Sequence, residues 1–216
     1  MVTLSLADIV TFLLLAARWT LLLSAIAFVG GATGATLLLF WRYGAPKIGG
    51  FATSMYIQLF QGTPLLLQLF LVFFGLPLLG IEVSPLAAAG IALTLYASAF
   101  LAEIWRGCVD AIPRGQWDAS ASLGMNFLTQ MRYVILPQSL KIAVPPTVGF
   151  LVQLLKSTAL ASIVGFNELT RSGQIVANAT FQPFLIYGLV ALIYFAMCYP
   201  LTVGSRVLER RMRISR

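Results

Sequence analysis

The chain has 216 residues, of which 59% are hydrophobic and 10% are charged, and its formal net charge is +7. Soluble domains carry about 25% charged residues, so this chain lacks the polar surface that a water-soluble globule needs. Its hydrophobicity excludes disorder, and its two cysteines exclude a secreted disulfide scaffold. Composition therefore predicts an integral membrane protein.

Five segments are apolar enough to cross a membrane, which takes about 20 mostly apolar residues. They are Trp19–Trp41, Phe51–Gly75, Pro85–Trp105, Ala143–Val164 and Pro183–Ser205. We expect the apolar run Leu6–Ala17 either to lie on the membrane surface or to lengthen the first helix. The predicted fold class is all-α and integral to the membrane, with about five transmembrane helices.

The basic residues give an orientation. Most of them fall in the loops after the first and third segments and in the C-terminal tail. The positive-inside rule places these parts in the cytoplasm and the N-terminus outside, which agrees with an odd number of spans. The net charge then reflects topology and contact with anionic membrane lipid, and no nucleic-acid partner is expected.

Several kinds of chemistry are absent from the sequence. Without histidine, a His-ligated metal site or a catalytic triad cannot form, and no Gly-Lys dipeptide exists for a Walker-type phosphate loop. We expect no catalytic residue and no metal site. Cys108 and Cys198 are expected to be reduced and to pack as small hydrophobes.

Small residues recur in the first segment at Ala27, Gly31 and Ala35. This four-residue spacing lets helix backbones approach closely. The stripe is either a subunit interface or a packing face within the chain.

The stretch Arg106–Pro137 is polar and lies between two predicted spans. A bare connection needs only about 4–6 residues. The stretch is therefore either a docking surface for a soluble partner or a solvated surface loop. DNA binding by two short helices is not expected here, because the neighbouring spans hold them against the bilayer.

Two short helices are predicted within this stretch, after a turn. The first covers Gln116–Leu123 and ends at Gly124, which suits the left-handed position after a helix. Asn126 can cap the second, which runs to about Leu136, and Pro137 is expected to end it.

Asp118-Ala119-Ser120, Gly124 and Val134-x-Leu136-Pro137 have the spacing of the EAA loop, E-A-A-x(3)-G-x(9)-I-x-L-P. The chain thus resembles the permease subunits of bacterial ABC importers. Further blocks are similar to the polar amino acid branch of these permeases. They are Gly62–Phe70, Ala102–Gly107, Pro113–Trp117, Leu155–Leu160 and Glu168–Arg171.

The resemblance implies a type I ABC importer permease fold, with residues 1–216 as a single transmembrane domain and a cytoplasmic coupling loop at 106–137. The first short helix would dock into a groove of an ATPase subunit, with Asp118 in that groove. The implied coupling residues are Trp117, Asp118, Ala119, Ser120, Gly124, Leu136 and Pro137. Three residues depart from the usual pattern, namely Asp118 for Glu, Ser120 for Ala and Gln61 for Arg.

The same resemblance implies partners and a location. An ABC ATPase dimer would bind ATP and magnesium, so no cofactor is expected in this chain. A second permease subunit, identical or homologous, would complete an alternating-access path. An extracytoplasmic binding protein would deliver a polar amino acid or close relative. The implied location is the bacterial cytoplasmic (inner) membrane.

Polar residues within spans are costly and often functional, and they concentrate in the fourth segment. Gln153 and Ser157 are four residues apart and share a helix face. For Lys156 a structural role is preferred, either an ion pair with an acid such as Glu103 or snorkelling. We expect Pro145-Pro146 to bend or restart this helix. The candidates for the substrate path are Gln58, Thr63, Gln68, Gly149, Gln153, Lys156, Ser157 and Thr158; those in the second segment could instead form hydrogen bonds between helices.

The family often carries G-N-[QE] before this lysine and Asp, Asn or Glu after it. Gly149, Phe150 and Ser157 stand at these positions here. An acidic clamp for a cationic side chain is therefore missing. Either arginine, lysine and histidine are not the cargo, or this chain is the non-binding half of a heterodimer.

Other functions fit the sequence less well. A self-contained secondary carrier or channel for small polar solutes is the main alternative, but many such carriers are built from internal repeats, which this sequence lacks. A membrane-embedded enzyme lacks histidine and paired acids here. A pure membrane scaffold is a further alternative.

Overall fold

The computed structural model describes residues 5–214, with side chains described as far as residue 210, so the basic side chains beyond Arg210 lie outside the described part. Every regular element in this range is helical. In chain order these are α1 (Leu6–Gly44), α2 (Ile48–Gly62), α3 (Leu65–Phe70), the π-helical turn η1 (Leu71–Gly75), α4 (Leu76–Leu78), α5 (Pro85–Asp110), α6 (Arg114–Ser122), α7 (Phe127–Gln130), the π-helical turn η2 (Met131–Ile135), α8 (Leu136–Ser157), the 3-10 turn η3 (Thr158–Ser162), α9 (Leu169–Thr180) and α10 (Pro183–Ile214).

The membrane-spanning segments agree with the prediction of about five spans, with one difference. Within the described residues, four helical stretches are long and apolar enough to cross a membrane, and α2 with α3–α4 forms a fifth that is bent by 101°. The bend within the second segment is a feature that the sequence analysis did not predict. α1 is continuous over 39 residues, so the run Leu6–Ala17 lengthens the first helix.

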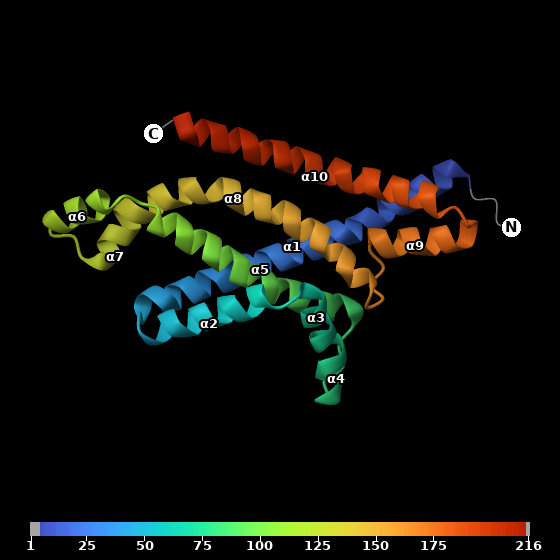
Figure 1. Ribbon diagram of the computed structural model, residues 1–216, viewed down its shortest axis with the longest axis horizontal. Coiled ribbons are helices and arrows are strands. Elements are labelled where there is room, and N and C mark those ends of the chain that lie inside the picture. The colour runs from blue at the N-terminus through green and yellow to red at the C-terminus, as the bar shows by residue number, and fades with distance from the viewer. Residues whose placement is uncertain (1–4, 215–216) are drawn as a thin grey trace.

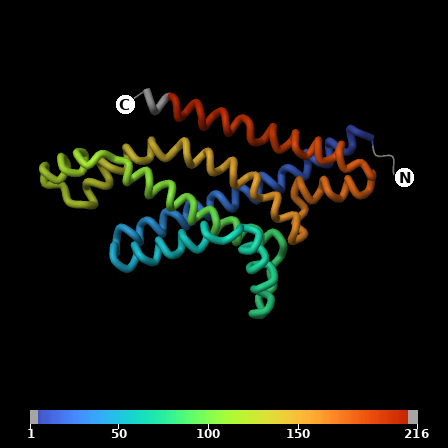
Figure 2. Tube along the Cα trace, viewed as in Figure 1, coloured from blue at the N-terminus to red at the C-terminus, as the bar shows by residue number. Residues whose placement is uncertain are grey.

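The long helices lie side by side, and their connections gather at two ends (Figure 1). The turn between α1 and α2, the α6–α7 loop and the end of α10 lie at one end. The N-terminal end of α1 and α9 lie at the other, and α3–α4 projects sideways as a separate arm (Figure 2). The three basic parts of the sequence therefore share one end.

α1 and α5 pack very closely because glycines on α1 face α5. A Cβ atom on Gly31 would stand 2.5 Å from the Ala97 Cβ, and one on Gly34 would stand 2.8 Å from the Ser98 Cβ. Ala27 and Ala35 are fully buried on the same helix. Of the two interpretations of the small-residue stripe, packing within the chain is thus the correct one.

A proline breaks the second span. Pro64 has no N–H, so the Phe60 carbonyl lacks its helical donor. The Gln68 side chain replaces that donor: its Nε2 lies 2.8 Å from the Phe60 oxygen, 3.1 Å from the Thr63 oxygen and 2.9 Å from Thr63 Oγ1. The Gln68 side chain thus provides a hydrogen bond for the Phe60 carbonyl, which would otherwise have none within the membrane.

Other prolines do not end their helices. Pro137 was expected to end the second short helix, but the chain continues from η2 into α8. Pro137 follows the π-helical turn η2 by two residues, and such a turn lets a helix continue past a disrupted hydrogen-bond ladder. α8 also runs without interruption through Pro145 and Pro146, so it does not restart there.

Substituting Gly31 with Ala tests the close packing of α1 on α5. The added methyl meets Ala97 and the backbone at Ser98, which cannot move aside as a flexible side chain would. We expect the purified protein to lose about 1–3 kcal/mol of stability and its melting temperature to fall by several degrees. Gly188→Ala, where the new methyl has open space, is the matched control. Equal melting temperatures for the two variants would contradict the packing argument.

Candidate functional site

The α6–α7 loop projects from the end of the molecule that carries the basic connections (Figure 1). α6 begins after Pro113 and ends near Leu123, within about two residues of the prediction. Gly124 follows with a φ of 74°, a left-handed conformation that suits glycine. The Asn126 side chain accepts a hydrogen bond from the Thr129 N–H and caps α7. The predicted turn chemistry is confirmed at both residues.

One face of α6 is fixed to the spans. Trp117 packs against a buried cluster formed by Val109, Ile112, Met131 and Ile135. Ser120 is buried, and its Oγ donates to the carbonyls of Gln116 and Trp117. Because the cluster joins the end of α5 to η2, a displacement of α6 acts on α5 and α8 together.

The opposite face of α6 is free within the chain. Asp118 and Ala119 are exposed, and Leu123 exposes 76% of its surface although the loop is polar. Leu128 on α7 exposes 73% and also borders the apolar cavity beside α1 and α8. Exposed leucines beside a carboxylate form the mixed surface that a soluble partner recognises. Their position on either side of Gly124 was the signal in the sequence, and the sequence analysis did not use it.

Leu136 and Pro137 lie elsewhere. They begin α8 rather than end the loop, and Leu136 lines an apolar cavity between α1, α5 and α8. Of the residues assigned to coupling, only those from Trp117 to Gly124 thus lie on the projecting loop.

A polar stripe follows one face of α8. Gly149, Gln153 and Lys156 are exposed, and Ser157 is half-buried. Gln153 Nε2 donates to the Tyr96 hydroxyl at 3.1 Å, which links the stripe to α5. Thr158 is separate from this stripe, because it is fully buried and its Oγ1 donates to the Leu155 carbonyl.

An aromatic stack lies beneath the stripe. Phe150, which is buried, stacks on Phe100 with ring centres 5.6 Å apart and on Tyr96 at 6.2 Å. Phe150 is therefore part of the core rather than of the polar stripe. Among the described residues, no acid forms an ion pair with the stripe.

The proposed pairing of Lys156 with Glu103 is wrong. Glu103 is held by Arg106, whose NH2 lies 2.6 Å from Oε1, and the same guanidinium reaches Asp110 at 2.5 Å. These three residues are one turn apart on α5, so they satisfy each other locally.

The candidates in the second span differ in their surroundings. Gln58 is exposed on α2, and Thr63 is exposed at the break. Gln68 is buried, and its amide nitrogen donates a hydrogen bond to the Phe60 carbonyl near the end of α2. Its structural partners match the alternative of hydrogen bonding between helical segments.

The sequence analysis did not single out Glu168 as a site residue. It is fully buried and caps α9, accepting hydrogen bonds from the N–H groups of Thr170 and Arg171 at 2.9 and 2.8 Å. The Tyr194 hydroxyl donates to it at 2.9 Å, and Thr20 Oγ1 lies 3.4 Å away. This carboxylate therefore ties α1, α9 and α10 together at the end opposite the α6–α7 loop.

The geometry combines membrane-spanning helices, a projecting loop and a polar stripe on one span. Within the part of the chain that the structure describes, no group of acids and cysteines could hold a metal ion. Cys108 and Cys198 are free and buried, as expected. Helical spans with a projecting loop and an unpartnered polar stripe define a membrane permease.

Comparison with known proteins identifies the family. The chain belongs to the family described as "Binding-protein-dependent transport system inner membrane component", whose sequence profile matches residues 34–214. It is an ABC importer permease, a multi-pass protein of the inner membrane. Proteins of this family act with ATPase and binding-protein partners.

Individual relatives agree along nearly the whole chain. The probable amino-acid ABC transporter permease YckA of Bacillus subtilis is 35% identical over 89% of this chain and 85% of its own length. The glutamine permease GlnP of Escherichia coli is 32% identical over 92% and 91%. A chain of an amino acid ABC transporter crystallised with histidines superposes with a TM-score of 0.90 at 32% identity, covering 97% of this chain and 99% of that one.

The Glu168 site predicts a specific dependence of stability on pH. Burial raises the pKa of Glu168 above its ordinary value, against the opposing effect of its hydrogen bonds. Between the ordinary and the raised pKa, the folded protein holds a proton that the unfolded chain releases, so this residue favours folding more as pH falls. The melting temperature of the natural protein relative to Glu168→Gln should therefore rise from about pH 8 to about pH 5.

Tyr194→Phe is the matched control for that measurement. It removes one hydrogen bond but keeps the carboxylate, so it should lower stability by about 1 kcal/mol and retain the pH dependence. A difference between the natural protein and Glu168→Gln that stays constant with pH would show that the buried carboxylate does not titrate as described.

Proposed function

We propose that this permease imports a neutral polar amino acid, with ATP hydrolysed by a partner subunit that docks on the α6–α7 loop. The observation that carries the proposal is the loop itself: one face is anchored to α5 and η2 through Trp117, and the other exposes Asp118 and Leu123. A short helix fixed in this way transmits a rigid-body displacement into the spans.

The coupling roles divide between the two faces of α6. Asp118 is the charged contact with the ATPase groove, and Ala119 allows that surface to approach closely. Trp117 and Ser120 hold the helix to the spans, and Gly124 provides the turn that lets α7 return to the membrane. ATP and magnesium belong to the ATPase in this scheme, since the sequence holds no Walker-type loop.

The substrate path follows the polar stripe of α8. Gln153 and Ser157 offer neutral hydrogen-bonding groups, and in residues 5–210 no acid forms an ion pair with Lys156 beside them. Such a surface suits an uncharged side chain better than a guanidinium or ammonium group. A second permease subunit, identical or homologous, faces this stripe and closes the path.

The orientation places the α6–α7 loop in the cytoplasm and the N-terminus outside. It is supported by the common position of the three basic parts at one end of the molecule (Figure 1). The opposite end, with α9 and the Glu168 site, then meets the extracytoplasmic binding protein.

Reversing the charge of Asp118 tests the coupling role. In Asp118→Lys, the permease should still insert but copurify with much less ATPase, and ATP-driven uptake should fall at least tenfold. Copurification in mild detergent with mass spectrometry of all subunits measures the first and identifies the second permease. Glu209→Lys, an exposed charge reversal on α10, is the control. Normal uptake and normal ATPase recovery in Asp118→Lys would exclude the role of this residue.

Competition for uptake tests the cargo. In vesicles holding the complete transporter, excess glutamine should compete with a labelled neutral polar amino acid, whereas excess arginine or histidine should not. Gln153→Leu should reduce uptake at limiting substrate about 3–10-fold, the value of one hydrogen bond. Thr202→Val, which removes a hydroxyl that bonds within α10 to the Cys198 carbonyl, should not. Strong competition by arginine would overturn the neutral cargo without affecting the assignment as an importer.

A further inference from the structure

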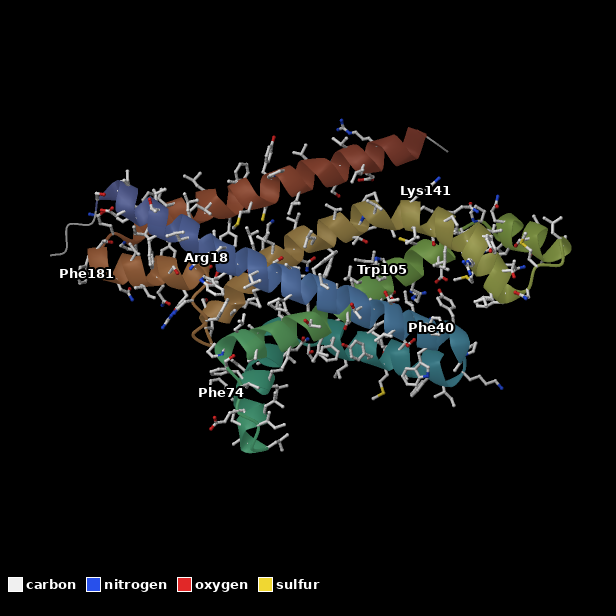
Figure 3. The ribbon with its side chains drawn as sticks, turned by 180° about the vertical axis from the view of Figure 1, so that it is seen from behind. Arg18, Phe40, Phe74, Trp105, Lys141 and Phe181 are labelled. Atoms are coloured by element: carbon white, nitrogen blue, oxygen red, sulfur yellow. The ribbon has the colours of Figure 1, made fainter. Side chains whose placement is uncertain are left out.

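A large apolar cavity lies between α1, α5, α7, η2 and the start of α8. Its volume is about 630 Å³, within the range of about 300–1,000 Å³ that is typical of ligand sites. Most of its lining is hydrophobic. The lining includes Leu39, Phe40, Trp105, Met131, Leu136 and Leu140. Phe40 and Trp105 lie toward the same end of the molecule as Lys141 (Figure 3).

The rim of this cavity is also apolar and exposed. Phe40 exposes 79% of its surface and Leu140 exposes 62%, although both lie on membrane-spanning helices. The side chains that line an apolar cavity gain dispersion contacts when an apolar group occupies it. In a bilayer, the acyl chain of a lipid is the apolar group available to occupy such a space.

A second hollow adjoins the first and carries a positive charge. It measures about 480 Å³ and is lined by Arg42, Pro46 and Gly50, together with Tyr43 and Phe127, which also line the apolar cavity. The two hollows therefore meet at the Tyr43–Phe127 pair, whose rings are 6.3 Å apart. These two adjoining hollows, one apolar and one beside a cation, are together called the groove.

Arg42 makes no ion pair within the described residues, although the Glu103 carboxylate, which is paired with Arg106, is near enough to attract it electrostatically. Its NH1 donates to the Gly50 carbonyl at 3.3 Å and to Ser54 Oγ at 3.0 Å, and both acceptors are neutral. The two ion pairs found in residues 5–210 both belong to Arg106. At the junction, the Tyr43 hydroxyl is buried and has no hydrogen-bond partner in that range. At this end of the groove, Glu103 and Asp110 are paired with Arg106, so Arg42 has no acid in direct contact among residues 5–210.

We propose that the groove binds an anionic phospholipid from the leaflet on the side of the α6–α7 loop. One acyl chain fills the apolar cavity, and the phosphate group lies against Arg42. The cationic and apolar hollows are arranged like the headgroup and acyl chain of a lipid in the bilayer. Arg42 is in the last turn of α1, and the apolar cavity extends back along that helix from Gly44 to Thr36. The lipid then contacts α1, α5 and η2, the elements that hold the proposed coupling helix.

Photoactivatable lipids test this site on the assembled transporter in vesicles. Phosphatidylglycerol with a diazirine on its acyl chain is compared with phosphatidylcholine that carries the same group. After illumination, peptide mapping should find adducts at Phe40, Leu136 or Leu140. We expect phosphatidylglycerol to label these residues about fivefold more, the effect of one cation near the membrane surface.

Variants separate the headgroup contact from the acyl contact. Arg42→Gln should bring the labelling ratio of the two lipids close to one, whereas Arg42→Lys should keep it. Arg18→Gln, on the same helix at the other end, is the matched control and should also keep it. Thr36→Phe fills the cavity and should reduce labelling by both lipids; the Thr36 hydroxyl bonds only within its own helix, to Ala32.

Three results would overturn the proposal. One is equal labelling by the two lipids in the natural protein, and another is a ratio that Arg42→Gln leaves unchanged. The third is the absence of adducts at the lining residues, which would mean that protein covers the groove. Labelling does not require substrate uptake, so failure of the lipid site and failure of the proposed import function are read separately.

Discussion

The close approach of α1 and α5 is the contact on which the rest of the fold depends. Apolar side chains gain little by leaving lipid for another apolar helix, so packing must hold transmembrane helices together. Gly31 and Gly34 remove the side chains that would keep the two backbones apart. α2 and α8 pack on this pair, and the largest buried cluster forms around it. The broken span and the polar stripe are both attached to this frame.

Features with a local cause could be predicted from the sequence. The spans follow from runs of apolar residues, and the turn at Gly124 and the cap at Asn126 follow from neighbouring residues alone. Prolines were less predictable, because each depends on its surroundings. At Pro64 a glutamine supplies the missing donor and the helix breaks, whereas before Pro137 a π-helical turn absorbs the disruption and the helix continues.

Contacts between residues that are distant in the sequence limited how much of the candidate sites could be predicted. The residues of the coupling loop are close in sequence, so their spacing was enough to place most of them on one short helix. Leu136 and Pro137 were misplaced because the loop ends earlier than its motif does. Glu168 could not be recognised as a buried site, since Thr20 and Tyr194 come from the first and last spans. Nothing near Glu168 in the sequence shows that distant hydroxyl groups will meet it.

The Glu168 site also has a consequence for the order in which the protein is made. Its carboxylate receives Thr20 from the first helix, its own α9 amides next, and the Tyr194 hydroxyl only from the last helix. During synthesis, the site is therefore incomplete until α10 has entered the membrane. A chain truncated before α10 lacks the Tyr194 donor and the packing of α10, so this buried carboxylate loses one of its four hydrogen-bond partners. The last helix to be synthesised thus completes the site begun by the first.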